Sequence, residues 1–174
     1  EIDTLERDIA RRSTLKASPD KEQLRALRRL ALLYKEKFLY EKAIDSYTRA
    51  LAVVETIHGS HEEQVTVLGE LADALDVVAC YDEAEPFVLR ALSLRQKIYD
   101  ELTTLESETI NRMAVNLHDV GRHYLHSRNY EKAESYLEES IAFFQQAGTQ
   151  DSQEAARAQV TRAKCLLALS QLDQ

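Results

Sequence analysis

The tetrad Tyr40-Glu41-Lys42-Ala43 recurs twice along the chain, as Tyr81-Asp82-Glu83-Ala84 and as Tyr130-Glu131-Lys132-Ala133. The alanines of successive copies are 41 and 49 residues apart. Self-similarity at such a spacing is the sequence signature of a repeat protein, in which each copy forms one unit that stacks on its neighbours. The chain is therefore predicted to be a repeat array.

The residues around each tetrad recur in register as well. Sixteen and twelve positions before the tetrad alanine lie a large and a small residue: Leu27 and Ala31, Leu68 and Ala72, Leu117 and Gly121. Nine positions before it lie Tyr34, Leu75 and Tyr124, and seven and eight positions after it lie Ala50-Leu51, Ala91-Leu92 and Ser140-Ile141. This template resembles the tetratricopeptide repeat, whose tightly packed helix pair needs a small residue near the crossing of each helix. The resemblance covers roughly residues 20–170.

The long spacing between copies indicates that the second helix of each pair is extended, which is typical of kinesin light chains. The segment Tyr81–Lys97 resembles the corresponding kinesin-light-chain helix, including a Glu85-Pro86 pair that we expect in its first turn, where proline is tolerated. The connector at residues 58–61 is also similar, although it lacks the family's proline.

The resemblance implies an all-α fold, a right-handed superhelical array of antiparallel helix pairs. The composition agrees, because four Gly and two Pro leave few breaks for anything except helices and short turns. We expect residues 1–174 to form a single repeat domain. Its expected parts are 1–17 (an N-terminal capping helix or the second helix of a degenerate repeat), 19–59, 60–106 and 107–148 (three repeats), and 151–171 (a terminal solvating helix).

The expected helix boundaries rest on local signals. Ser18-Pro19 is predicted to be an N-cap followed by the first helical residue, and Ser60-x-x-Glu63 to be a capping box. Gly59 and Gly148 are predicted to end helices, and Asp151-x-x-Glu154 to start the last one.

Charge and cysteine content exclude several classes of function. The net charge of −8 disfavours general nucleic-acid binding, which needs clusters of Lys and Arg. Cys80 and Cys165 lie about two repeats apart, so we expect reduced thiols and a cytoplasmic protein. No stretch approaches the roughly 18 consecutive apolar residues of a membrane span.

Catalytic and cofactor motifs are missing from the sequence. It contains no glycine-rich phosphate loop, no Cys-x-x-Cys and no His-Glu-x-x-His, so we expect neither enzymatic activity nor a cofactor. His118, His123 and His126 share one predicted helix, but their spacing does not let all three reach one ion. We interpret them as polar surface histidines and predict no metal site.

The resemblance places the ligand-binding surface in a concave groove lined by the first helix of each pair. Carried onto this sequence, the groove positions that we predict to bind are Arg25, Arg28, Arg29, Leu32 and Lys35, then Glu70, Asp73, Asp76 and Val77, then Val115, His118, Arg122, Leu125 and His126, and finally Arg157 and Lys164. Basic groups thus lie at both ends of the array, with acidic groups in between.

Two interpretations of these charges remain open. In the first interpretation, the arginines bind acidic residues of an extended peptide, for which guanidinium forks are well suited. Alternatively the groove is neutralised internally, Arg28 and Arg29 pairing with Glu70 and Asp73, and Asp76 with Arg122 or His118, for only about 0–1 kcal/mol per exposed pair. The carboxylate clamp of the family's chaperone-tail binders is not reproduced, because Leu32 and Glu70 stand where that clamp has asparagine.

The predicted function is that of a protein–protein interaction module or adaptor, which binds a short, partly acidic linear motif of another protein. Two alternatives differ in class. One is a structural scaffold that self-associates through the helix bearing Ile2, Leu5 and Ile9; the other is the regulatory arm of a larger enzyme.

Overall fold

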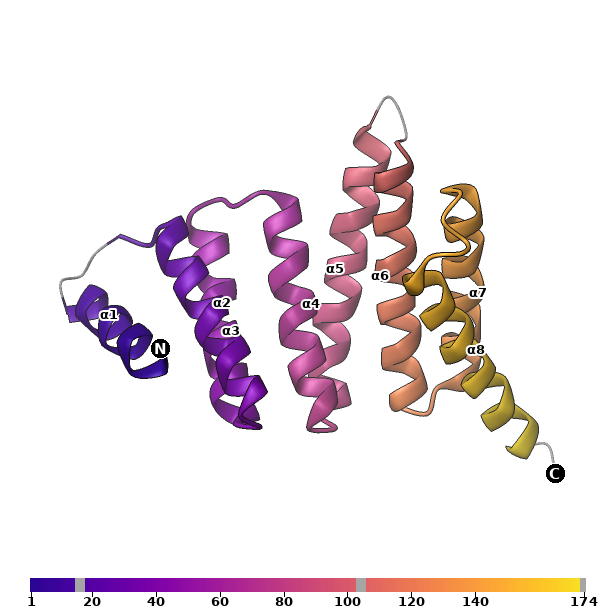
Figure 1. Ribbon diagram of the computed structural model, residues 1–174, viewed down its shortest axis with the longest axis horizontal. Coiled ribbons are helices and arrows are strands. Elements are labelled where there is room, and N and C mark those ends of the chain that lie inside the picture. Colours follow the sequence, from indigo (N-terminus) through magenta and orange to yellow (C-terminus); the bar gives the residue numbers. More distant parts are fainter. Residues whose placement is uncertain (15–17, 103–105, 173–174) are drawn as a thin grey trace. The chain divides into compact units, whose positions relative to one another are not determined.

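The computed structural model describes residues 1–14, 18–102 and 106–172, and every regular element in these ranges is an α-helix. The helices are α1 (Ile2–Thr14), α2 (Lys21–Glu36), α3 (Tyr40–Thr56), α4 (His61–Val77), α5 (Tyr81–Glu101), α6 (Ser107–His126), α7 (Tyr130–Gln146) and α8 (Gln153–Leu172) (Figure 1). The predicted all-α class is confirmed. The chain divides into two compact units, Glu1–Ala84 and Glu85–Gln174.

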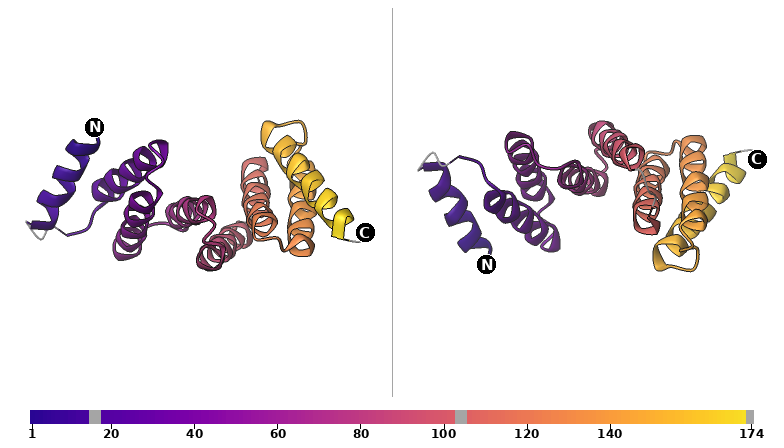
Figure 2. Two further views of the ribbon diagram at one scale, coloured as in Figure 1. Left: turned by 90° about the horizontal axis from the view of Figure 1, so that it is seen from below. Right: turned by 90° about the horizontal axis from the view of Figure 1, so that it is seen from above.

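The first unit is a row of helices in which each packs on the next, α1 on α2, α2 on α3 and α3 on α4 (Figure 2). The antiparallel pair α2–α3 is close because its template positions are small: Ala31 and Ala43 are completely buried. Leu27 and Val54 fill the remaining space and are also completely buried. Apolar burial of this kind stabilises the pair by about 25 cal/mol per Å² removed from water.

In the second unit α6 packs on α7, and α8 packs on α7 and on α6. Gly121 lies where α6 meets α7, and a Cβ built on it would lie 2.6 Å from Leu137 Cγ and 3.3 Å from the Ala133 carbonyl oxygen. The two backbones therefore approach as closely as they do only because Gly121 has no side chain. Ala114, Phe144, Ala155 and Ala158 form the core beneath α8.

Substituting the two helical glycines by alanine should therefore have opposite effects. Gly121→Ala should lower the free energy of unfolding by roughly 1–3 kcal/mol, because Leu137 and the α7 backbone have to move. Gly69→Ala is the matched control: nothing lies within 4 Å of its Cβ position in α4, so better helix propensity should raise stability by about 0.5–1 kcal/mol. Urea denaturation followed by circular dichroism measures both. Equal effects would contradict the close α6–α7 crossing.

The turn between the helices of each pair has one recurring geometry. The residue two before each tetrad tyrosine is left-handed, with φ of 59° at Phe38, 60° at Ala79 and 63° at Arg128. The following amide donates to the carbonyl of Tyr34, Leu75 and Tyr124, at 2.9, 3.0 and 2.8 Å respectively. This is the Schellman arrangement, which usually places glycine at the left-handed residue. The repeats thus keep the turn without the glycine that favours it.

Replacing one of these residues by glycine should stabilise the protein. Ala79→Gly should raise the free energy of unfolding by about 0.5–1 kcal/mol, because an L-residue in the left-handed region costs roughly 1–2 kcal/mol. The same substitution at exposed Ala52, in the middle of α3, should lower it by about 1 kcal/mol. Urea titrations of the two variants provide the comparison. A destabilising Ala79→Gly would rule out the left-handed conformation at this turn.

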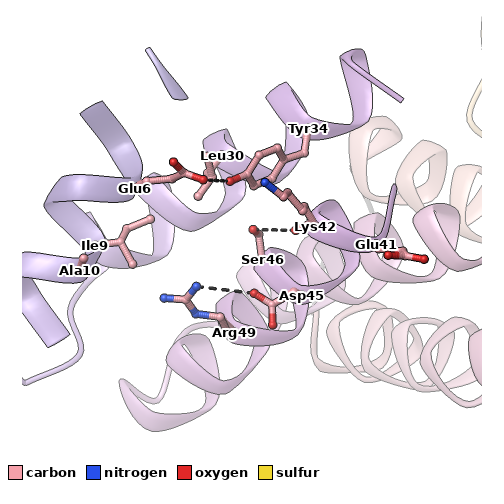
Figure 3. Close-up of a pocket in the computed structure, with 10 residues that line it drawn as sticks. All are labelled: Glu6, Ile9, Ala10, Leu30, Tyr34, Glu41, Lys42, Asp45, Ser46 and Arg49. Atoms are coloured by element: carbon pink, nitrogen blue, oxygen red, sulfur yellow. Dashed lines mark hydrogen bonds and ion pairs between the residues drawn. The ribbon is translucent and has the colours of Figure 1, made fainter. Parts of the chain in front are cut away.

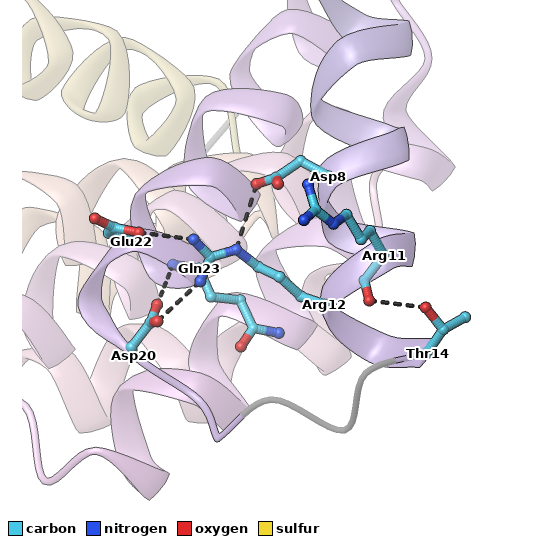
Figure 4. Close-up of polar contacts among 7 residues, drawn as sticks. All are labelled: Asp8, Arg11, Arg12, Thr14, Asp20, Glu22 and Gln23. Atoms are coloured by element: carbon cyan, nitrogen blue, oxygen red, sulfur yellow. Dashed lines mark hydrogen bonds and ion pairs between the residues drawn. The ribbon is translucent and has the colours of Figure 1, made fainter.

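The start of α2 differs from the prediction. Its N-cap is Asp20, whose carboxylate accepts a hydrogen bond of 2.7 Å from the Gln23 amide, so Ser18-Pro19 lies before the helix. The Asp20 carboxylate is also held by Arg12 of α1, at 2.8 Å, while the same guanidinium contacts Glu22 at 2.7 Å (Figure 4). The backbone hydrogen bond and Arg12 both lower the pKa of Asp20. Aspartate caps a helix as well as serine does, and here it has a cationic partner besides.

Other local predictions are partly right. The Ser60–Glu63 capping box is confirmed, and Gly148 ends α7 with φ of 72°. At the end of α3, however, the left-handed residue is His58, and Gly59 is instead required for its close contact with Val54.

The start of α8 and the place of Pro86 in α5 also differ from the predictions. α8 is capped by Ser152, which accepts from the Ala155 amide at 3.1 Å, rather than by Asp151. Since α5 begins at Tyr81, Pro86 lies in its second turn, where its ring leaves the Asp82 carbonyl without the usual intrahelical donor.

A tyrosine, a glutamate and a lysine link α1 to α2 in the way they link α5 to α6. Tyr124 donates a hydrogen bond of 2.7 Å to Glu85, and Lys132 lies 4.7 Å above the Tyr124 ring. The hydrogen bond from Tyr124 lowers the pKa of Glu85. In the first unit Tyr34 donates to Glu6, and Lys42 lies 5.4 Å above the Tyr34 ring.

The Glu6–Tyr34 contact also indicates which helix of a repeat α1 corresponds to. Burial, together with the Glu6 contact, raises the pKa of Tyr34 to about 12. Glu6 of α1 accepts a hydrogen bond from Tyr34 of α2, just as Glu85 of α5 accepts one from Tyr124 of α6. We propose on this basis that α1 is the second helix of a degenerate repeat.

Candidate peptide-binding site

The basic groove positions of the first unit are largely neutralised by acidic residues of the same unit. Arg28 on α2 makes a bidentate contact with Glu70 on α4, from Nε to Oε2 at 2.8 Å and from Nη2 to Oε1 at 2.6 Å. The hydrogen bond to Glu70 raises the pKa of Arg28. Lys35, two turns after Arg28 on α2, pairs with Asp73 of α4. The predicted pairing of Arg28 with an α4 carboxylate is confirmed, whereas the partner of Asp73 is Lys35, which was not predicted.

Arg29 does not take part in that arrangement. Its Nε lies 2.7 Å from Oε1 of Glu1, just before α1, so the predicted pairing with an α4 carboxylate is wrong. Asp76 is only 5% exposed and offers little surface to a ligand. Arg25, Leu32 and Val77 are exposed.

In the second unit four of the predicted positions come together around one cavity of about 280 Å³. It lies between α6 and α8, with a side chain of α7 at its wall, and is lined by Val115, His118, Asp119, Arg122, Phe144, Glu154 and Arg157. The remaining predicted positions, Leu125, His126 and Lys164, are not part of this lining.

The polar groups of this cavity are held by their neighbours. His118 Nε2 lies 3.2 Å from the Thr161 hydroxyl of α8, and His118 Nδ1 lies 3.6 Å from Asp119. Arg122 approaches the same Asp119 oxygen at 3.9 Å. Arg157 is exposed and forms no ion pair within the described residues. One wall thus carries a guanidinium that is available to an anion, while Val115 and Phe144 are apolar.

A second cavity was not predicted from the sequence. It measures about 490 Å³ and lies in the first unit between α1, α2 and α3 (Figure 3). Ile9 and Leu30 contribute apolar surface, and Asp45 faces Arg49 at 3.6 Å. Because α1 departs from the repeat template, its position relative to α2 could not be inferred, and neither could this cavity. The one available signal for this arrangement was the spacing between Tyr34 and Lys42, because the same two residue types recur at the same spacing in the third repeat.

The structure also bears on catalysis and metal binding. Among the described residues no group of three or more His, Cys, Asp or Glu side chains could hold a metal ion. The interpretation of the three histidines as surface residues is wrong for His123, which is only 2% exposed, whereas His126 is exposed and His118 is half-buried. Cys80 and Cys165 are both free thiols, and burial raises the pKa of Cys165, whose sulfur contacts the Tyr130 carbonyl at 3.1 Å. In the part of the chain that the structure describes, none of the helices has the length and apolar character needed to traverse a bilayer.

Consecutive helix pairs with a shared crossing register define the class of the protein: a helical-repeat domain. Residues 22–97 match the family described as tetratricopeptide repeat, so this stretch consists of tetratricopeptide repeats, as predicted. The family's repeats are typically non-catalytic interaction scaffolds. No curated protein matches the sequence.

Solved structures of similar fold cover almost the whole chain. One such structure contains nearly identical TPR-like repeats of a kinesin light chain from Podosopora anserina. Its sequence is 19% identical to this chain and its TM-score is 0.77, and the match covers 98% of this chain and 78% of that one. BtubC (BKLC) from P. vanneervenii is 19% identical with a TM-score of 0.65, over 96% and 71%. A Rap protein complexed with competence and sporulation factor is 18% identical with a TM-score of 0.70, over 99% of this chain but 44% of that one. The predicted kinesin-light-chain-like repeat fold is therefore confirmed.

A double-mutant cycle tests the neutralised surface of the first unit. With Arg28→Ala, Glu70→Ala and the double variant, the coupling energy from urea denaturation should be about 0.5–1 kcal/mol and should fall as salt is raised. The same cycle on Arg29 and Glu1, which are both exposed, should give a smaller coupling. A coupling of zero for Arg28 and Glu70 would mean that Arg28 is available to a ligand.

Proposed function

We propose that this domain is a non-catalytic adaptor that binds an extended, partly acidic peptide segment of a partner protein. The observation that supports this proposal best is the cavity between α6 and α8, where Arg157 and Arg122 lie beside the apolar Val115, with the buried Phe144 beneath. A cytoplasmic location is part of the same proposal, and rests on the two free thiols.

The chemistry of the cavity favours a glutamate side chain as its occupant. A guanidinium binds a carboxylate through parallel hydrogen bonds, and such charge-assisted bonds contribute roughly 1.5–3 kcal/mol. The apolar wall suits the aliphatic stem of glutamate. Asp119 and Glu154 repel a second carboxylate placed beside the first, so they favour a segment in which acidic residues alternate with other residues.

The groove residues of the first unit would contribute differently. Arg28 and Lys35 are already paired with Glu70 and Asp73, so a peptide gains little from them. Arg25 and Leu32 are exposed on α2, and we include them as secondary contacts for a segment of the same kind.

The similar structures support an interaction role. The Rap protein was solved with a bound factor, competence and sporulation factor, and its repeats share this fold. The alternative of self-association through α1 is less favoured, because Ile9 is only 3% exposed and Ile2 and Leu5 are half-buried. Whether the domain regulates an enzyme stays a prediction.

Binding of a labelled acidic peptide tests the proposal. The probe is a fluorescein-labelled peptide of alternating glutamate and leucine, compared with one in which glutamine replaces glutamate. Fluorescence anisotropy at low salt should give roughly tenfold weaker binding for Arg157→Glu, about 1.4 kcal/mol, and weaker binding at higher salt.

Arg112→Glu is the matched control, since it makes the same charge change on α6 outside the cavity. Its affinity for the peptide should stay close to that of the unmodified protein. If both variants lose affinity equally, or if the glutamine peptide binds as well, the cavity is not the anchor for an acidic side chain.

A further inference from the structure

The cavity between α1, α2 and α3 opens at a position where the other two repeats carry an aromatic residue. The third residue after the tetrad alanine is Phe87 in the second repeat and Tyr136 in the third, but it is Ser46 in the first. Ser46 lines the cavity, and Figure 3 shows it across from Ile9 and Ala10 of α1. The first repeat therefore has a small hydroxyl side chain where its two counterparts have a ring.

In the third repeat this ring stacks on the tyrosine of the preceding helix. The ring centroids of Tyr136 and Tyr124 are 5.6 Å apart, and the two planes differ by 11°. Lys132 lies 4.7 Å from the centroid of the same Tyr124 ring, so the lysine and the second ring are accommodated together. The first repeat keeps the tyrosine and the lysine, 5.4 Å apart, and has serine in place of the second ring.

The walls of the two places also correspond. Glu6 of α1 and Glu85 of α5 each accept a hydrogen bond from the tyrosine of the next helix. Three residues later lie Ile9 and Val88, which are 3% and 7% exposed. On this correspondence, the open space in the first unit follows from the small side chain of Ser46.

The rim of the cavity is polar and more acidic than basic. Its exposed charged side chains are three carboxylates and two cations: Glu6, Glu41, Asp45, Lys42 and Arg49. Asp45 and Arg49 lie 3.6 Å apart, and an exposed pair of this kind is weak enough to open for a ligand. A neutral ring that carries a hydrogen-bond donor suits such a rim better than an acidic group does.

Below the rim the lining is apolar. Ile9, Leu30 and Tyr34 form the floor and are buried, so each offers only the small part of its surface that faces the cavity. Exposed Ala10 and the aliphatic stems of the two rim cations add contact area at the sides. A tyrosine side chain matches both levels, because it combines a large apolar ring with one hydroxyl group at its tip.

We propose that this cavity binds a tyrosine side chain of a partner protein, whose ring lies beside Tyr34 as the ring of Tyr136 lies beside Tyr124. The phenol hydroxyl donates a hydrogen bond to a rim carboxylate. Basic residues on either side of the tyrosine are favoured by the excess of negative charge at the rim. This cavity shares no residue with the one between α6 and α8, so it is a second binding site beyond the proposed function.

The test uses a fluorescein-labelled peptide in which one tyrosine is flanked by lysines. Fluorescence anisotropy should show binding to the complete chain, and Ser46→Tyr, which places the ring of the third repeat in the cavity, should weaken it roughly tenfold or more. Thr48→Tyr is the matched control. Thr48 is exposed on the same helix outside the cavity, and its hydroxyl donates to the carbonyl four residues earlier at 2.8 Å, as that of Ser46 does. It should leave the affinity unchanged.

The stability of Ser46→Tyr provides a second readout. Its midpoint of urea denaturation should not fall, because the new ring fills open space. Ala10→Trp, at an exposed position of α1 that lines the cavity, should weaken peptide binding without replacing a buried residue.

Several outcomes would overturn the proposal. They are no binding of the peptide, equal binding to Ser46→Tyr and Thr48→Tyr, equal binding of a peptide with alanine in place of tyrosine, and a marked loss of stability in Ser46→Tyr. A concentration-dependent dimer in sedimentation that Ser46→Tyr abolishes would make a second copy of the chain the occupant, and would overturn it as well. Arg157→Glu should not change the affinity for the tyrosine peptide, and Ser46→Tyr should not change that for the glutamate–leucine peptide. Failure here is thereby distinguished from failure of the proposed function.

Discussion

Close approach of two helix backbones is the constraint on which the architecture depends. At Gly121 any side chain would meet Leu137 and the Ala133 carbonyl. In the first unit the small side chains of Ala31 and Ala43 are completely buried. Ridges of one helix enter grooves of the next only when such positions stay small. This requirement fixes the register of each pair, and the register in turn decides which side chains of the first helices lie on the predicted groove face.

Charges then distinguish the groove positions of the two units, which have the same helix register. Groove positions of the first unit carry arginine and lysine opposite Glu70 and Asp73, so the charges satisfy each other. In the second unit the counterparts of Arg28 and Lys35 on α6 are His118 and Leu125, and two other cations, Arg122 and Arg157, line the cavity. Exposed ion pairs contribute little to stability, but in the proposed interaction they would determine which guanidinium is left for an acidic side chain of the partner.

The sequence predicts the fold better than the site because the two depend on interactions of different range. Ala43, Ala84 and Ala133 recur with their neighbours in strict register, and that repetition is sufficient to infer paired helices. The capping of α2 by Asp20 was missed because Ser18-Pro19 offers an equally good local signal, and only the contact with Arg12 of α1 decides between them. Likewise the partner of Arg29 is Glu1, far away in sequence, and the cavity next to α1 depends on a helix that lacks the template.

The tyrosine–glutamate–lysine contact divides the junctions between repeats into two kinds. It links α1 to α2 and α5 to α6, whereas the second repeat holds Leu75, Ile44 and Glu83 at the same three positions. Junctions of the first kind share one polar contact, whereas the junction before α4 has isoleucine and leucine in place of the glutamate and the tyrosine. During evolution, duplication or loss of whole repeats would therefore be tolerated most easily between like junctions, since a mixed junction would oppose a tyrosine hydroxyl to isoleucine.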